Sequence, residues 1–227
     1  MALSGTNNLR QRQTNRTLTA ATVEPVTLAE VKEHLRITFD AQDAYIEDAI
    51  VAAREEIEAV SGFSFTTATF LTVLDRLPGA TDEWWDGARY GSIAYLHGAQ
   101  NILAQIELPA YPLIEVLTAT FTDYANVETS AVPADLFNID TVSYPGRVAL
   151  KQGAVWPIAG RNINSVKLTY TAGFGATAAD VPEWAKRAIR TMAAYLYDNR
   201  GVGCSTADAY HASGADRIVR KFRATRF

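Results

Sequence analysis

The stretch TDEWWDG combines the residue types with the most obvious chemical potential in this chain. Trp84 and Trp85 stand beside three carboxylates, Asp82, Glu83 and Asp86. Two carboxyl groups near an aromatic surface are what a glycoside hydrolase uses to cleave a sugar. Adjacent tryptophans on an irregular segment are also typical of contacts between proteins. We expect these tryptophans to pack a loop or a subunit contact, and keep a carbohydrate-active enzyme or binding module as the alternative.

Other catalytic signals are missing from the sequence. His34, His97 and His211 lie far apart and fall in different expected elements. No HExxH, GxSxG, Walker or GxGxxG motif occurs. The single cysteine, Cys204, cannot form an internal disulfide or a cysteine-based zinc site. We therefore expect a protein that is not an enzyme, with no catalytic residue, no metal site and no cofactor.

The segment RIVRKFRATRF at 217–227 carries the strongest binding signal, with five basic side chains and no carboxylate. Apolar residues alternate with these cations, which is the composition of a segment that docks into an apolar groove framed by acidic residues. DNA contact and a short membrane-surface helix are the alternatives. The predicted partner-binding residues are Arg217, Ile218, Val219, Arg220, Lys221, Phe222, Arg223, Arg226 and Phe227.

The charge is unevenly distributed along the chain. The formal net charge is -4, yet residues 1–23 carry +3 from Arg10, Arg12 and Arg16, and residues 215–227 carry +4. Removing these +7 charges leaves -11 for the part between them. Because affinity for DNA comes largely from cations that neutralise phosphates, an acidic body excludes a DNA-binding groove across the main surface. The two basic ends remain able to touch phosphate.

Helices are expected on both sides of a β region. Thr27 and Glu30 form a capping box at the start of the first helix, and Gly62 supplies a stop for the second. Pro182 suits the first turn of the third. Apolar residues at three- and four-residue steps predict these helices over 27–37, 41–61 and 182–200.

The region 64–173 reads as strands rich in Thr, Val and Phe, separated by turn residues. Strands are predicted over 63–77, 102–108, 114–123, 135–140, 147–151 and 165–173, with an insertion at 76–101. The predicted fold class is α+β: a helical bundle of N-terminal and C-terminal helices with an antiparallel β excursion between them and flexible termini. The predicted division is a flexible arm over 1–23, a folded domain over 24–203 and a basic docking tail over 204–227.

Several motifs in this order resemble one family. They are PVTLAEVKEHLRI, DAYIEDAIVAAREEIEAVSGFSF, IELPAYPLIEVLTATFTD, FNID, GRV, WP, VKLTYTAGFG and VPEWAKRAIRTMAAYLYDNR. Together they are similar to the head–tail connector (adaptor) proteins of tailed bacteriophages and gene transfer agents, the gp6-like or DNA-packaging group. The likeness runs from about residue 24 to 200.

This resemblance implies a structural protein without an active site. Its members form a ring of identical subunits, usually twelvefold, beneath the portal, which extends the DNA channel toward the tail. The expected partners are other copies of this chain, the portal protein, a tail-side neck or stopper protein, and DNA that passes without specific binding; no membrane is involved. The expected location is the virion neck, with assembly in the host cytoplasm. The basic tail would then meet the portal, and Trp84 and Trp85 a neighbouring subunit or the tail. A nucleic-acid-binding packaging accessory is the alternative.

Overall fold

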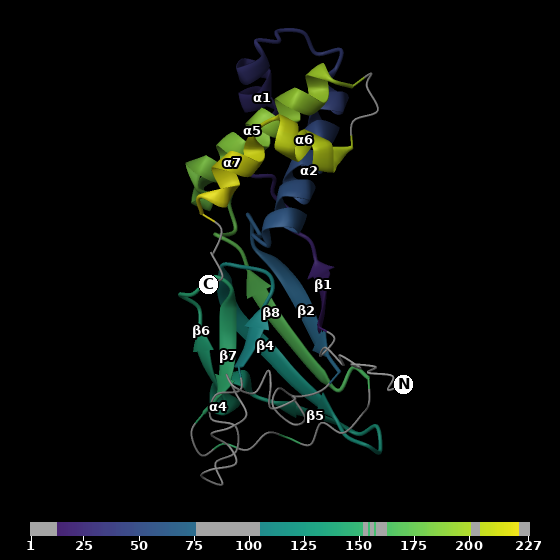
Figure 1. Ribbon diagram of the computed structural model, residues 1–227, viewed down its shortest axis with the longest axis vertical. Coiled ribbons are helices and arrows are strands. Elements are labelled where there is room, and N and C mark those ends of the chain that lie inside the picture. Colours follow the sequence, from purple (N-terminus) through teal and green to yellow (C-terminus); the bar gives the residue numbers. More distant parts are fainter. Residues whose placement is uncertain are drawn as a thin grey trace, which may run out of the picture.

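The computed structural model describes residues 13–75, 105–151, 154, 157, 163–200 and 205–222. Two bodies follow one another along the long axis of the molecule, with helices at one end and two sheets at the other (Figure 1). We call them the helical body and the sheet body. The expected combination of helices with antiparallel sheets is confirmed.

The helical body begins as its capping residues predict. Thr27 Oγ1 accepts a hydrogen bond from the backbone N–H of Glu30 at 3.3 Å, and the Glu30 carboxylate accepts one from the Thr27 N–H at 2.7 Å. Gly62 ends the second helix with φ 83, and a Cβ there would lie 2.8 Å from the Tyr111 ring, so only glycine suits this turn. The helices are α1 (Leu28–Leu35), α2 (Asp43–Ser61), α5 (Glu183–Asp198), α6 (Thr206–Ala212) and α7 (Ala215–Arg220).

One apolar core unites these five helices. Ile46 and Ile57 of α2 meet Ile189 and Met192 of α5 there, and α7 adds Val219. All five of these side chains are fully buried. Because α2 and α5 are separated by the whole β region, the helical body depends on segments from both ends of the described chain.

The sheet body contains a five-stranded and a three-stranded sheet, in the orders β1-β2-β8-β4-β5 and β3-β7-β6. Every paired strand is antiparallel to its neighbour. The strands are β1 (Gln13–Thr19), β2 (Ala68–Leu74), β3 (Gln105–Leu108), β4 (Leu113–Thr122), β5 (Glu128–Ala131), β6 (Phe137–Asp140), β7 (Gly146–Leu150) and β8 (Val166–Ala172). Short helices lie at α4 (Pro133–Leu136) and η2 (Ala178–Asp180).

The two sheets share a second apolar core. Leu108 and Val148 of the smaller sheet lie in it with Leu168 of the larger one, and all three are fully buried. Gly146 of β7 approaches β4 closely, because a Cβ there would lie 2.5 Å from the Cβ of Leu113. A glycine at this point therefore lets the two sheets meet.

Strand β1 corrects the expectation of a flexible arm over residues 1–23. It pairs with β2 from Gln13↔Leu74 to Thr19↔Thr69, although all seven of its side chains are exposed. A side-chain attachment is made by Asn15, whose Oδ1 accepts hydrogen bonds from Thr72 Oγ1 at 3.1 Å and Tyr170 Oη at 3.2 Å. The prediction is wrong for residues 13–19, and residues 1–12 lie outside the described part.

Smaller differences concern the ends of the predicted strands. The first begins at Ala68 rather than residue 63, because residues 63–67 cross between the two bodies. The strand expected at 135 begins at Phe137, after the short helix α4, and β5 was not predicted. The insertion at 76–101 lies outside the described residues. Among the helices that the structure describes, none has the length and apolar character needed to span a bilayer.

Candidate subunit and partner interfaces

The C-terminal segment, residues 205–222, folds back onto the helical body. Ser205 caps α6 by accepting the N–H of Asp208 at 3.1 Å, and α7 packs against α5 and α6. Val219 is 0% exposed, and Ile218 is partly buried against the same core. These two side chains therefore complete the chain's own core, which differs from the prediction that they form an edge for a partner. The expected domain over 24–203 and the expected tail over 204–227 both contribute side chains to this core.

Phe222 anchors the end of this segment at the junction of the two bodies. Its ring stacks on Trp184, with centroids 4.5 Å apart and planes 11° from parallel. Trp184 in turn meets the edge of Phe63, with 5.2 Å between their centroids. Phe222 remains 45% exposed, so one face of its ring still meets solvent.

The cations of α7 face away from this core. Arg217, Arg220 and Lys221 are all exposed. Arg220 lies 3.2 Å from the carboxylate of Asp216, which is also 3.6 Å from Nδ1 of His211. The positive surface predicted for the tail is therefore present on α7, while its predicted binding role stays a prediction.

The other residues predicted to contact a partner lie outside the described part of the chain. They are Arg223, Arg226, Phe227, Trp84 and Trp85. In the described ranges, no group of three or more His, Cys, Asp or Glu side chains is placed to hold a metal ion. His34 and His211 lie on different helices, α1 and α6.

An aromatic cluster joins the helical body to the sheet body. Phe63, after α2, packs edge-on against Tyr111, before β4, with 4.6 Å between ring centroids. Tyr144 stacks on Tyr111 at 5.8 Å and reaches Phe63 at 6.1 Å. The Tyr111 hydroxyl donates to the Ser61 carbonyl, and the Ser64 N–H donates to the Tyr111 carbonyl at 2.8 Å. Ring packing and hydrogen bonds thus hold the two bodies in one arrangement.

A charged cluster reinforces the same junction. Arg54 donates from Nε to Glu24 at 2.9 Å and from Nη1 to Glu58 at 2.7 Å. The other oxygen of Glu58 accepts the N–H of Phe65 at 2.8 Å. Burial raises the pKa of the Glu58 carboxyl. Burial opposes the charge of Arg54, but its pairs with Glu24 and Glu58 raise its pKa overall.

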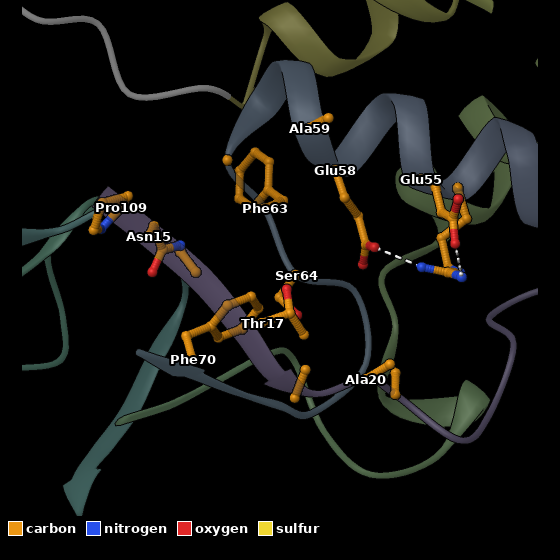
Figure 2. Close-up of a pocket in the computed structure, with 15 residues that line it drawn as sticks. Asn15, Thr17, Ala20, Glu55, Glu58, Ala59, Phe63, Ser64, Phe70 and Pro109 are labelled. Carbon is orange, nitrogen blue, oxygen red and sulfur yellow. Dashed lines mark hydrogen bonds and ion pairs between the residues drawn. The ribbon is translucent and has the colours of Figure 1, made fainter. Parts of the chain in front are cut away.

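A groove of about 600 Å³ opens between β1 and the last turns of α2 (Figure 2). Figure 2 shows β1, with Asn15 and Thr17, passing below the end of α2, from which the Glu58 side chain points down toward the strand. The rings of Phe63 and Phe70 and the alanines contribute apolar surface, while Glu55 and Glu58 add carboxylates. Such a site suits a small apolar group or side chain with a polar surround.

The turn between β6 and β7 holds an apolar side chain out in solvent. Asp140 Oδ1 accepts the N–H groups of Val142 and Ser143, both at 3.1 Å. Its other oxygen accepts Nε of Arg147 and Oγ of Ser143, both at 2.8 Å. The Arg147 contact, helped by Ser143, holds the pKa of the Asp140 carboxyl well below its usual range. Val142 at the tip is 86% exposed.

Sequence reasoning found neither the groove nor this turn as a site. The turn has a local signal, since Asp140 and the Ser, Pro and Gly of SYPG are residues that favour turns. The groove has none, because β1, α2, β2 and the loop before β4 each contribute only a few of its residues.

Comparisons with known proteins agree with this architecture. Residues 25–136 match the model of a family described as "Phage gp6-like head-tail connector protein". No curated protein matches the chain.

Three solved structures have a similar fold. A chain from the neck of an empty gene transfer agent (GTA) particle, computed with C6 symmetry, matches with a TM-score of 0.68 and 22% identity over 94% of this chain and 97% of that one. A chain from the virion of a native GTA particle matches with a TM-score of 0.64 and 21% identity, over 94% and 96%. A chain from the neck of a native GTA particle, computed with C12 symmetry, gives a TM-score of 0.63 and 22% identity, over 94% and 97%. The family match and the shared fold together make the chain similar to the phage gp6-like head-tail connector family.

Proposed function

We propose that this chain is a structural head–tail connector that forms a homo-oligomeric ring in the neck of a phage or phage-like particle. The observation that carries the proposal is the likeness of its fold, over 94% of the chain, to neck proteins of GTA particles. Two of those necks were computed with C6 and C12 symmetry, which supports a cyclic arrangement. A twelvefold ring beneath the portal is the arrangement that we propose.

The ring would extend the DNA channel from the head toward the tail. The chain between the two basic ends carries a net charge of -11. An acidic lining attracts few phosphates, so DNA would pass through the channel without being retained. On this proposal the protein has a mechanical role and no catalytic one.

The exposed side of α7 is the surface that we propose for the portal. Arg217, Arg220 and Lys221 point outward while Val219 fixes the helix to its own core. Docking would therefore rest on charge, with the residues after Phe222 continuing the same positive segment. The segment that contains Trp84 and Trp85 is proposed for the opposite, tail-side contact or for a neighbouring subunit.

Electron microscopy of the purified protein, alone and mixed with portal-bearing particles, tests the proposal directly. We expect rings in the free protein or at the particle neck, since a portal can template their assembly. A reconstruction of assembled particles in which the neck contains no density for this chain would contradict the connector role.

A charge reversal on α7 tests the portal surface. The double variant Arg217→Glu with Lys221→Glu should weaken portal binding at least tenfold while the melting temperature stays unchanged, because both side chains are exposed. Arg16→Glu on β1 is the control, an exposed cation in the sheet body. If the double variant binds portal normally but loses salt-sensitive binding to duplex DNA, the DNA-packaging alternative replaces portal docking.

A further inference from the structure

We propose that the β6–β7 turn of each subunit inserts Val142 into the groove between β1 and α2 of a second copy of this chain. The inference rests on the proposed ring and names the contact that builds it. It concerns only residues that the structure describes.

The turn has the properties of a preformed projection. A single exposed valine is ordinary on a protein surface. Here, however, four hydrogen bonds from Val142, Ser143 and Arg147 converge on the Asp140 carboxylate and fix the turn beneath the 86%-exposed side chain. A contact made by an already ordered segment loses less conformational entropy on binding. The turn is therefore ready to enter a recess without rearrangement.

The groove has matching size and chemistry. Its volume of about 600 Å³ lies within the range of sites that enclose small ligands, and would hold the tip of a turn. Phe70 and Ala59, which are not buried, provide apolar surface for a valine side chain. The hydroxyl and amide of Thr17 and Asn15 can meet the polar backbone of an entering turn.

The two features lie at the same level of the molecule and on opposite sides. The ring of Phe63 lines the groove and also contacts Tyr144 of the turn, so both features adjoin the junction between the bodies. Figure 1 places β6 and β7 on the left of the sheet body and β1 on the right. A head-to-tail contact between opposite sides of identical subunits generates a ring when its rotation closes.

Charges beside the two features are complementary. Arg147, which pairs with Asp140 at 2.8 Å, keeps 47% of its side chain exposed beside the turn, and Glu55, 3.4 Å from Arg54, keeps 66% exposed at the groove. Opposite charges at the rim of an interface help to set the register between partners more than its affinity. An Arg147–Glu55 pair across the interface would orient the entering turn.

The test compares two valines in the full-length protein. Val142→Asp should reduce ring formation at least tenfold, measured by mass photometry and by neck occupancy on portal-bearing particles, because a carboxylate would enter an apolar groove. Val127→Asp is the matched control, an exposed valine on the β4–β5 connection. Both variants should keep the wild-type circular dichroism spectrum and melting temperature, since neither side chain is buried.

Disulfide trapping supplies a second measurement. In a Cys204→Ser background, Val142→Cys combined with Ala59→Cys should give covalent oligomers in oxidised rings or necks, whereas Val127→Cys with Ala59→Cys should not. Normal rings with Val142→Asp, or no trapping in assembled rings, would overturn this contact and leave the connector role intact. If wild type forms no ring in solution or at the neck, the proposed function itself fails.

Discussion

The helical body and the sheet body differ in how completely each buries its own apolar surface. The helical body closes around one core to which even the C-terminal Val219 contributes. The sheet body exposes its edge strand β1 along its whole length and shows Tyr124 at 81% exposure and Val132 at 61%. Exposed strand edges and apolar groups are surfaces that other chains can use. The sheet body therefore leaves more apolar and strand-edge surface open to other chains than the helical body does.

Alanine substitutions in the two cores should have the largest effects. Ile57→Ala in the helical body and Leu168→Ala in the sheet body should each lower the free energy of unfolding by about 2–5 kcal/mol, because both side chains are fully buried. We expect a single unfolding transition in urea, since Phe63 and Tyr111 join the bodies. Two transitions, each shifted by only one variant, would show that the bodies unfold separately.

A charge at Val219 should have the next largest effect. Val219→Asp should cost about 1–3 kcal/mol, a loss limited because α6 and α7 can detach while the rest stays folded. Hydrogen exchange should then accelerate in residues 205–222 but not in the sheets. The exposed neighbour Arg217→Asp should cost less than about 0.5 kcal/mol. Equal effects of the two changes would mean that the segment does not pack as described.

Acid should affect the sheet body through Asp140. Because its pKa lies below the unfolded value of 3.8, its stabilisation is present above pH 3.8 and is lost as the pH falls toward the folded pKa. Asp140→Asn should therefore lower stability near neutral pH by at most about 1 kcal/mol, given its solvent exposure. Thermal unfolding of both proteins should converge at low pH. A difference that persists there would assign the effect to something other than ionisation.

Loosening β1 should have the smallest effect on global stability. Asn15→Ala removes the acceptor for Thr72 and Tyr170, so hydrogen exchange should accelerate in residues 13–19 alone. The free energy of unfolding should fall by less than about 1 kcal/mol, because β1 buries no apolar side chain. Thr14→Ala, another exposed position of β1, serves as the control. Faster exchange throughout β2 and β8 would show that β1 supports the whole sheet.

Local signals were enough to predict most elements. Thr27 and Glu30 form the capping box that their spacing indicates, and Gly62 ends α2. The alternating residues of β8 produce alternating burial, as a strand between two neighbours in a sheet requires. These features depend on residues close together in the chain, so a sequence pattern records them.

Features that depend on distant contacts could not be predicted in the same way. Strand β1 has no apolar alternation, because all its side chains are exposed and its pairing comes from the backbone of β2. The apolar residues of α7 suit a partner's groove and the chain's own core equally well, and their sequence does not distinguish the two. The groove brings Asn15, Ala59 and Pro109 together across separate elements, which no short motif encodes.

The return of α7 to the helical core has a consequence for the order of biogenesis. During synthesis, every described strand up to β8 can pair before α5 has been made, since β8 ends at Ala172. The core around α2, which ends at Ser61, is completed only by α5, which begins at Glu183, and by Val219. Because domains tend to fold as their residues emerge from the ribosome, a truncated translation product would keep its helical end open. Such a product would expose apolar surface to proteases and chaperones, which favours the entry of full-length subunits into particles.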